Sequence, residues 1–356
     1  MKYNFFAGPA ILPQPVMRQA AEAVIDFNNM GLSILEISHR SNEVIDVFDE
    51  AESIIYELLN IDRDQYAVMF LSGGASSQFF MTAMNLLNPN ESAGYVDTGS
   101  WSSKAIKEAK LFGNINIIAS SKEAGYTHIP KKYEIPSNLS YVHITSNNTI
   151  YGTQYQTWPE SPVPLVSDMS SDIFSRRLPM EKFDLIYAGA QKNLGPAGVT
   201  LVIVKKEITG KVNRIIPTML QYPIHIEHQS MYNTPPVFPV YVSMLTLRWL
   251  KKLGGLSAME KRNQEKAVLL YREIDRNPLF KGNVVAEDRS LMNVCFVALN
   301  EAHEKPFLSL CESAGCVGLK GHRSAGGFRA SIYNAMDKKG VQVLVDVMQD
   351  FEKKYG

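Results

Sequence analysis

Seven short apolar runs between Ala67 and Val204 constrain this chain more than any other feature of its sequence. Longer mixed segments separate them, and each run is apolar on both faces of an extended strand. Strands of that kind form mainly parallel sheets covered by helices on both sides, with ligands bound beyond their carboxyl ends. The predicted strands are residues 67–71, 94–96, 115–118, 141–144, 164–167, 184–187 and 199–204.

Helical spacing of apolar residues frames this predicted sheet. Residues 15–30 and 41–59 are predicted helices ahead of it. After the sheet, prolines interrupt the pattern until a helical stretch starts at Val240 and ends at Gly254-Gly255. The two glycines therefore mark a domain boundary.

The remainder of the chain is typical of a smaller α/β unit. A long helix is followed by predicted strands at 293–299 and 328–332, and by closing helices up to Phe351. No internal repeat is present. We expect an N-terminal arm over residues 1–15, a large domain over 16–255 and a small C-terminal domain over 256–356.

Composition excludes several classes of function. The 356 residues carry 36 Lys+Arg and 36 Asp+Glu, so the chain offers no global positive field for nucleic acid or an anionic membrane. No apolar stretch reaches the roughly 20 residues of a membrane span, and Gly8 and Pro9 break any secretory leader. Three cysteines without a CxxC pair indicate free thiols, so we expect a cytoplasmic protein without nucleic-acid or membrane partners.

A turn of small residues, Ser72 to Ser77, follows the first predicted strand and precedes a helical stretch. Small residues let an anion approach the backbone, and the helix N-terminus favours a phosphate there. The turn matches neither the dinucleotide nor the Walker pattern. A tight strand-to-helix turn without a ligand explains it equally well.

Asp168 ends the fifth predicted strand, and Lys192 follows the sixth within a turn rich in Gly, Ala and Pro. A desolvated lysine has a depressed pKa and acts as a nucleophile or Schiff-base former. Taken singly, Asp168 is equally a helix N-cap and Lys192 a solvated loop residue. Their combination with the turn at Ser72 is more informative than any one of them.

These three parts match the needs of one cofactor, pyridoxal phosphate. Its phosphate requires a helix N-terminus, its pyridinium nitrogen a carboxylate and its aldehyde a lysine. Trp101, which follows the second predicted strand, is either a stacking partner for the ring or a packing residue of a loop. The sequence therefore predicts a pyridoxal-phosphate site at the strand ends.

Several separated motifs resemble the phosphoserine aminotransferase family, which belongs to class V of the fold-type I pyridoxal-phosphate enzymes. The resemblance spans essentially the whole chain, through NFFAGPA at 4–10, EISHRS at 36–41, GAQKNLGPAG at 189–198 and ASIYNA at 330–335. It implies that Lys192 carries the cofactor and moves the proton, and that Asp168 pairs with the pyridinium nitrogen.

The same resemblance assigns the remaining contacts to the cofactor. Trp101 stacks on the ring, and Thr149 hydrogen-bonds near the ring hydroxyl. The phosphate is held by a second group of residues, completed from a partner subunit, so that a homodimer follows from the shared site. This group consists of Ala75, Ser76 and Gln191, with Asn233 and Thr234 of the partner subunit.

Substrate selection requires two cationic pockets, one for a carboxylate and one for a phosphate, and Arg suits both. By resemblance Arg329 binds the alpha-carboxylate. His39, Arg40, His322 and Arg323 surround the substrate phosphate, or the side-chain carboxylate of glutamate. From the residues alone, the segment 320–329 is equally a solvated surface loop.

The expected activity is reversible transamination between L-glutamate and 3-phosphohydroxypyruvate, giving O-phospho-L-serine and 2-oxoglutarate in L-serine biosynthesis. Activity in pyridoxine biosynthesis is left open. The rivals are an alanine–glyoxylate aminotransferase, a cysteine desulfurase and a non-enzymatic phosphate-binding protein. A metal site at His225, Glu227 and His228 is rejected, because no third convergent ligand accompanies the cluster.

Overall fold

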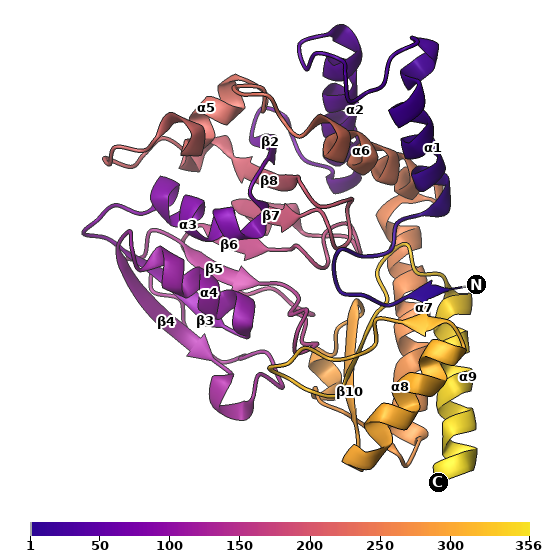
Figure 1. Ribbon diagram of the computed structural model, residues 1–356. Helices are drawn as coiled ribbons and strands as arrows, with labels where there is room; N and C mark the ends of the chain where they lie inside the picture. The colour runs from indigo at the N-terminus through magenta and orange to yellow at the C-terminus, as the bar shows by residue number, and fades with distance from the viewer. Residues whose placement is uncertain (1) are drawn as a thin grey trace.

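A computed structural model describes residues 2–356 (Figure 1). Within these residues no helix is long and apolar enough to span a bilayer. The α-helices are α1 (Gln14–Ile25), α2 (Asn42–Leu59), α3 (Gly74–Leu86), α4 (Ser100–Ala109), α5 (Tyr222–Glu227), α6 (Val237–Lys252), α7 (Gly255–Arg276), α8 (Glu304–Ser313) and α9 (Lys338–Tyr355). The strands are β1 (Tyr3–Asn4), β2 (Tyr66–Leu71), β3 (Ser92–Asp97), β4 (Asn114–Ser120), β5 (Val142–Thr145), β6 (Leu165–Asp168), β7 (Leu185–Gly189), β8 (Thr200–Lys205), β9 (Phe280–Gly282), β10 (Asn293–Ala298), β11 (Cys316–Val317) and β12 (Phe328–Ser331).

All seven predicted strands are confirmed, and they form one sheet in the order β2-β8-β7-β6-β5-β3-β4. The pairs from β7 through β6, β5 and β3 to β4 are parallel. Only β8 runs antiparallel to its neighbours β2 and β7. The expected mostly parallel sheet is therefore confirmed.

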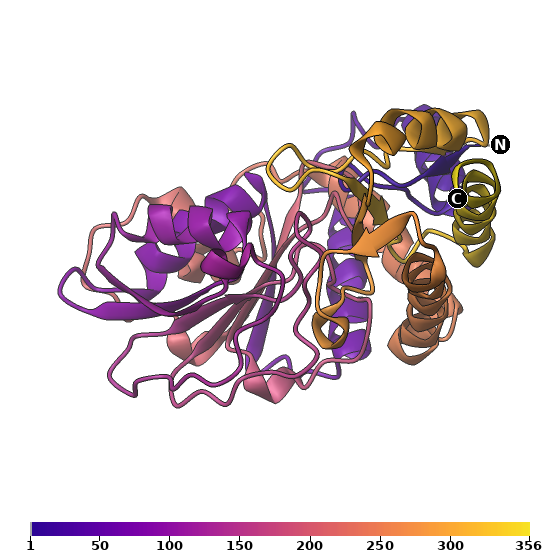
Figure 2. The same cartoon turned by 90° about the horizontal axis from the view of Figure 1, so that it is seen from below.

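The alternation of side chains along each strand explains the layers on the two faces of the sheet. In β2, Val68 and Phe70 pack into a core with α1, α2 and α6, whereas Met69 and Leu71 pack with α3, α4 and α5 on the other face. Both faces are covered by helices, as Figure 2 shows from below. This double cover explains why the central strands, such as β6 and β7, are buried along their length, whereas the edge strand β4 is largely exposed.

The helix predicted over residues 15–30 is wrong beyond Ile25, where α1 ends. The chain instead makes a turn in which Asn28 and Asn29 have left-handed φ values of 53° and 59°. Asparagine tolerates this region because its short side chain bonds locally. The Asp26 carboxylate also accepts a hydrogen bond from the Gly31 N–H (2.9 Å), which favours the turn over a further helical turn.

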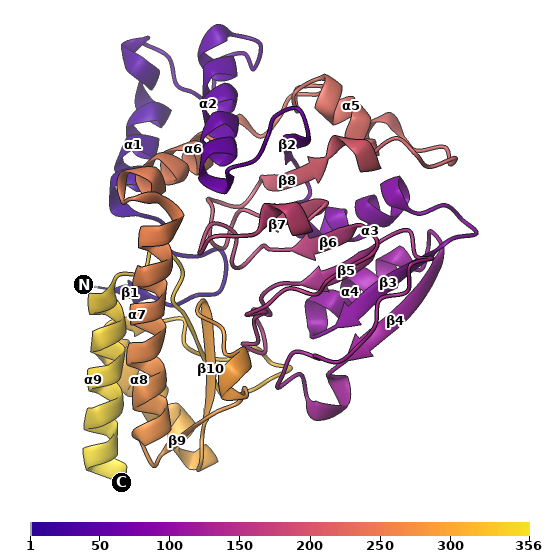
Figure 3. The same ribbon diagram turned by 180° about the vertical axis from the view of Figure 1, so that it is seen from behind.

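The C-terminal region has its own apolar core around the antiparallel sheet β12-β10-β9, packed against α7, α8 and α9. The strands predicted near 293–299 and 328–332 are confirmed as β10 and β12. Tyr3 and Phe5 belong to this same core, because β1 pairs in parallel with β11. Figure 3 shows the two chain ends on the same side of the molecule, beside α7 and α9.

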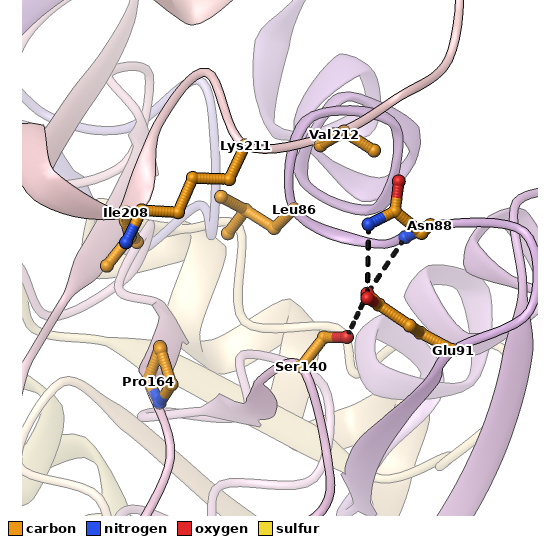
Figure 4. Close-up of a pocket in the computed structure, with 8 residues that line it drawn as sticks. All are labelled: Leu86, Asn88, Glu91, Ser140, Pro164, Ile208, Lys211 and Val212. Carbon is orange, nitrogen blue, oxygen red and sulfur yellow. Dashed lines mark hydrogen bonds between the residues drawn. The ribbon is translucent and has the colours of Figure 1, made fainter.

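A hollow of about 290 Å³ lies where the parallel strands of the large sheet begin, among segments that flank the amino ends of β3, β5 and β6 (Figure 4). Its one carboxylate, Glu91, accepts hydrogen bonds from the Asn88 backbone and side chain and from Ser140 Oγ (2.6 Å). The hydrogen bond from Ser140 lowers the pKa of Glu91 most. Because these partners satisfy the carboxylate, we interpret this hollow as structural.

Lys266 of α7 is almost fully buried, 2% exposed, and burial lowers its pKa to about 7. Its ammonium donates three hydrogen bonds, to the carbonyls of Ile332 (2.9 Å), Tyr333 (2.7 Å) and Met336 (3.0 Å). Its three donors thus each have an acceptor, and they anchor the segment that follows β12 to α7.

We expect Lys266→Met to lower the free energy of unfolding by about 2–4 kcal/mol, because it leaves three buried carbonyls without a donor. Lys261→Met, at an exposed position of the same helix, is expected to change it by less than about 0.5 kcal/mol. Equilibrium unfolding in urea measures both. Equal midpoints for the two variants would contradict the anchoring role.

Candidate active site

The carboxyl ends of β2, β3, β6 and β7 bring the predicted site residues to one edge of the large sheet. β2 leads into the turn at Ser72, and β3 leads into α4 with Trp101 in its first turn. β6 ends on Asp168, and β7 leads into the turn that holds Lys192. This is the edge at which open α/β sheets bind ligands.

The turn after β2 has the geometry of an anion cradle. Gly73 and Gly74 have φ values of 102° and 69°, and a Cβ on Gly73 would lie 2.0 Å from Ser77 Oγ. No side chain caps the N-terminus of α3, so its first N–H groups, which include those of Ala75 and Ser76, are free to bind a ligand.

Asp168 is a buried carboxylate whose position is set by Ser170. Its Oδ1 accepts hydrogen bonds from the Ser170 N–H (2.9 Å) and Oγ–H (2.6 Å). Ser170 Oγ in turn accepts from the Gly189 N–H (3.1 Å), at the end of β7. Burial raises the pKa of Asp168, and the nearby Lys192 amine opposes that shift. Ser170 was not predicted from the sequence, although its place two residues after a strand-end Asp is typical of an Asx turn.

Lys192 directs its amine at two of the predicted partners. Its Nζ donates to Thr149 Oγ1 (2.8 Å) and lies 5.1 Å from the centre of the Trp101 ring. Burial lowers the pKa of Lys192 to about 8, with Asp168 opposing and Arg329 reinforcing the shift. A substantial fraction of this amine is therefore neutral near physiological pH and able to act as a nucleophile.

Arg329 approaches Lys192 from the C-terminal region. Its Nη1 donates to the Thr149 carbonyl (3.2 Å), while its buried Nε has no partner among the described residues. His322 lies near it, because the positive charges of Arg329 and Arg323 help burial to lower the pKa of His322. The structure thus gathers predicted cations from the segment 320–329 beside the lysine.

The N-terminal arm also reaches the lysine turn, which the sequence did not predict. The Ala10 N–H donates to the Gln191 carbonyl (2.9 Å), and a Cβ on Gly8 would lie 3.2 Å from Lys192 Cγ. The Ala7 carbonyl accepts from the Tyr333 hydroxyl (2.7 Å). These contacts span the whole chain length, and no local pattern signals them.

Four predicted residues are not joined to this group within one chain. Within residues 2–356, no hydrogen bond or ion pair links His39 or Arg40 to the other predicted site residues, although His39 Nε2 is buried without a partner. Asn233 lines a small hollow with Ser72 and Ser77, but its side chain bonds only to the Thr234 carbonyl (3.1 Å).

The residues present fit pyridoxal phosphate. The free N–H groups of α3 suit its phosphate, the Asp168 carboxylate its ring nitrogen and the Lys192 amine its aldehyde. The Trp101 Nε1, buried without a partner in the described residues, belongs to a ring available for stacking beside the amine. Other unpaired atoms, such as Arg329 Nε, are available to a carboxylate.

Comparison with known proteins agrees with this geometry. The family described as aminotransferase class-V matches residues 2–344. The phosphoserine aminotransferase of Flavobacterium psychrophilum is 59% identical over 353 residues, which cover 99% of each chain. The solved structure of the phosphoserine aminotransferase from Bacillus circulans subsp. alkalophilus superposes with a TM-score of 0.97 at 44% identity, over 100% of this chain and 99% of the other.

A solved structure described as pyridoxal-phosphate-bound phosphoserine aminotransferase, from Trichomonas vaginalis, superposes with a TM-score of 0.92 at 34% identity, over 98% of this chain and 100% of the other. Full-length identity of this kind, together with the strand-end lysine and aspartate, leaves no competing family assignment. The chain belongs to the class-V aminotransferases and, within them, to the phosphoserine aminotransferase family.

Proposed function

We propose that this protein is a pyridoxal-phosphate-dependent phosphoserine aminotransferase. It transfers the amino group of L-glutamate to 3-phosphohydroxypyruvate, giving O-phospho-L-serine and 2-oxoglutarate in L-serine biosynthesis. The observation that carries the proposal is the convergence on the Lys192 amine of Thr149 and Trp101, with Asp168 and Arg329 near enough to shift its pKa.

Lys192 acts as the proton carrier in this proposal. Its amine, with a pKa of about 8, would take the proton from the substrate alpha carbon as a base and, as an acid, would deliver it to the former aldehyde carbon of the cofactor. The bound cofactor supplies an electron sink for the resulting carbanion. Thr149, which accepts a hydrogen bond from this amine, orients it between transfers.

The cofactor is held at both ends by groups that the fold presents. Asp168, fixed by Ser170, would hold the ring nitrogen, where its buried carboxylate would stabilise a positive charge. The first N–H groups of α3, at Ala75 and Ser76, would hold the phosphate together with the part-buried Gln191. Trp101, beside the lysine amine, would stack on the ring.

Two sets of positively charged side chains would bind the two anionic ends of the substrate. The Arg329 guanidinium binds the alpha-carboxylate through its fork, beside the Lys192 amine. His322 and Arg323, on the more exposed loop, take the substrate phosphate or the second carboxylate of glutamate, together with His39 and Arg40. A substrate with two anionic ends is thereby preferred over alanine.

The capture of pyridoxal phosphate by the cofactor-free protein is expected to accelerate with pH. Only the neutral amine of Lys192 attacks an aldehyde, so the rate rises from pH 6 and reaches half its plateau at about pH 8. Stopped-flow absorbance records the rate. An exposed lysine in a short peptide serves as control, with its midpoint near its ordinary pKa of about 10.4. If the rate for the protein reached half its plateau only at the pH found for the peptide lysine, a desolvated Lys192 would be contradicted.

A homodimer is part of the proposal, with Asn233 and Thr234 of the partner subunit completing the phosphate site. Large apolar side chains support it, because Leu32, Leu35 and Ile215 are exposed on the surface of the single chain, and Leu32 and Leu35 are close in sequence to His39. A second copy would cover such side chains. Analytical ultracentrifugation is expected to give a molecular mass twice that of one chain. A fully active monomer would contradict a phosphate site shared between two subunits.

The arrangement of cores supports the proposed domains and location. One core gathers residues from α7 to α9 and the N-terminal arm, while two others flank the large sheet, in keeping with an arm at 1–15 and domains at 16–255 and 256–356. The three cysteines are buried and unbonded, as in a reducing cytoplasm. Burial raises the pKa of Cys316 to about 11, which disfavours the desulfurase alternative.

The absorption band of the holoprotein tests the proposed activity. We expect O-phospho-L-serine to remove the band, whereas L-alanine and L-cysteine leave it unchanged at equal concentration. A response to a control alone would transfer the function to another class-V enzyme. A parallel addition of 4-phosphohydroxy-L-threonine tests the pyridoxine-pathway substrate, and a protein that never acquires a band would be a binding protein.

A further inference from the structure

Three consecutive backbone carbonyls near the site accept hydrogen bonds from three buried asparagines. Ile173, Phe174 and Ser175, which follow β6, supply the carbonyls. Their donors are, in order, Asn193 Nδ2 (2.7 Å), Asn334 Nδ2 (2.9 Å) and Asn263 Nδ2 (3.0 Å). We call Asn193, Asn263 and Asn334 the asparagine clamp; their exposed fractions are 7%, 0% and 8%.

The three asparagines come from three different parts of the molecule and also bond to one another. Asn193 directly follows Lys192, Asn263 lies on α7, and Asn334 lies between β12 and α9. Asn193 Oδ1 accepts from the Asn334 N–H (3.0 Å), and Asn334 Oδ1 accepts from Asn263 Nδ2 (2.8 Å). A continuous chain of hydrogen bonds therefore runs from the lysine turn to α7.

The carbonyl segment itself is held in an unfavourable conformation. Phe174 has a φ of +57°, a left-handed value that a bulky side chain rarely adopts. Such strain persists where the surroundings over-determine it, and it concentrates at functional sites. The clamp provides this constraint, since it engages the carbonyls of Phe174 and of both its neighbours.

The clamp connects the three groups on which the proposed chemistry depends. Its carbonyl segment lies five residues beyond Asp168, and Asn193 is adjacent to Lys192. Asn334 is five residues beyond Arg329, in the stretch that Lys266 anchors to α7. No other hydrogen bonds between the described residues join the Lys192 turn directly to the stretch after β12.

We propose that Asn334, as the centre of the asparagine clamp, is a positioning residue that sets the place of Arg329 relative to Lys192 and Asp168. The proposal rests on the function proposed above. Asn334 is suited to this role because its N–H, Oδ1 and Nδ2 each bond to a different element. Its loss removes the link from the stretch after β12 to the Lys192 turn and to the Phe174 carbonyl. The strand β12 stays paired with β10, and Asp168 stays fixed by β6 and Ser170, so the change falls on how the two parts are placed relative to each other.

The test compares Asn334→Ala with Asn277→Ala. Asn277 is an equally buried asparagine beyond the far end of α7, and its side chain donates to Glu273 (2.9 Å) and to the Met348 carbonyl (3.2 Å). We expect kcat to fall by about 10–100-fold in Asn334→Ala and by less than about 2-fold in Asn277→Ala, at similar losses of stability. An equal effect on kcat in the two variants would overturn the proposal.

A second readout does not require the cofactor or the proposed substrate. Reductive methylation of the cofactor-free protein with formaldehyde, followed by mass spectrometry of the Lys192 peptide, gives the pH midpoint of that amine. Because Arg329 depresses it, Asn334→Ala is expected to raise the midpoint by about half a pH unit, and Asn277→Ala to leave it unchanged. An unchanged midpoint in Asn334→Ala would overturn the positioning role even if the protein proved inactive on phosphoserine.

A milder variant covers the case in which Asn334→Ala does not fold. Asn263→Ala removes only the outer bonds of the clamp, to Ser175 and to Asn334 Oδ1. Its kcat and its Lys192 midpoint are expected to move in the same directions by smaller amounts. A folded Asn263→Ala protein that matches the wild type in both would equally overturn the proposal.

Discussion

Replacing Lys192 by Ala is expected to lower the rate of transamination by about 10⁴-fold or more. The Lys192 amine lies against both Thr149 and the Trp101 ring, and removing it takes away the proton carrier and the covalent attachment together. Steady-state rates with L-glutamate and 3-phosphohydroxypyruvate measure the loss. Borohydride reduction of the variant should leave no cofactor on the protein.

The control for this result is Lys122→Ala, which removes an exposed lysine that makes no side-chain hydrogen bond among the described residues. Its rate should equal that of the wild type, and borohydride should trap cofactor on it as usual. A Lys192→Ala protein with near-normal turnover would overturn the assignment of the site, whatever its overall similarity to known aminotransferases.

Replacing Arg329 by Ala has the second largest expected effect, a fall in kcat/KM of about 10²–10³-fold for both the amino acid and the keto acid. Both substrates carry the carboxylate that this guanidinium binds, so their KM values should rise together. Arg329→Lys keeps the positive charge but lacks the planar guanidinium, so its kcat/KM should lie between those of the wild type and Arg329→Ala. Arg272→Ala, an exposed position on α7, is the matched control.

The Arg329 variants also alter the lysine. Because the Arg329 charge helps to depress the pKa of Lys192, its removal should raise that pKa above about 8. The pH of half-maximal cofactor capture is then expected to move upward in Arg329→Ala and to stay in place in Arg329→Lys. Unchanged KM values for both substrates would exclude the carboxylate role of Arg329.

Much of the fold could be predicted because burial on both faces leaves a direct trace in the sequence. The central strands of the large sheet are apolar at successive residues, as in the run 199–204, and all seven strands were predicted near their true places. The reversed direction of β8 was not predicted, since a buried strand has the same composition in either direction. The excess length predicted for α1 arose because residues 26–30 keep some apolar character while their backbone turns.

The site residues also differ in whether the sequence alone could predict them. Asp168 and Lys192 were predicted because they directly follow strands whose carboxyl ends must meet at one edge. The asparagine clamp was not, because its role depends on hydrogen bonds between positions as distant as 193 and 334. Ser170 was missed although it bonds locally to Asp168, because a serine after a strand is common and its bond to Gly189 cannot be inferred from the sequence. Polar side chains of this kind look the same in a sequence whether they are solvated or buried.

The pairing of β1 with β11 has a consequence for the order in which the enzyme matures during synthesis. Tyr3 cannot pair with Cys316 until residue 316 has left the ribosome, long after the seven strands of the large sheet, the last of which ends at Lys205, have emerged. The arm that touches the Lys192 turn therefore docks after the large sheet has been synthesised. A nascent chain that stops before β11 would lack the pairing that holds the arm, so the contacts of the arm with the Lys192 turn would be missing and the centre would be immature.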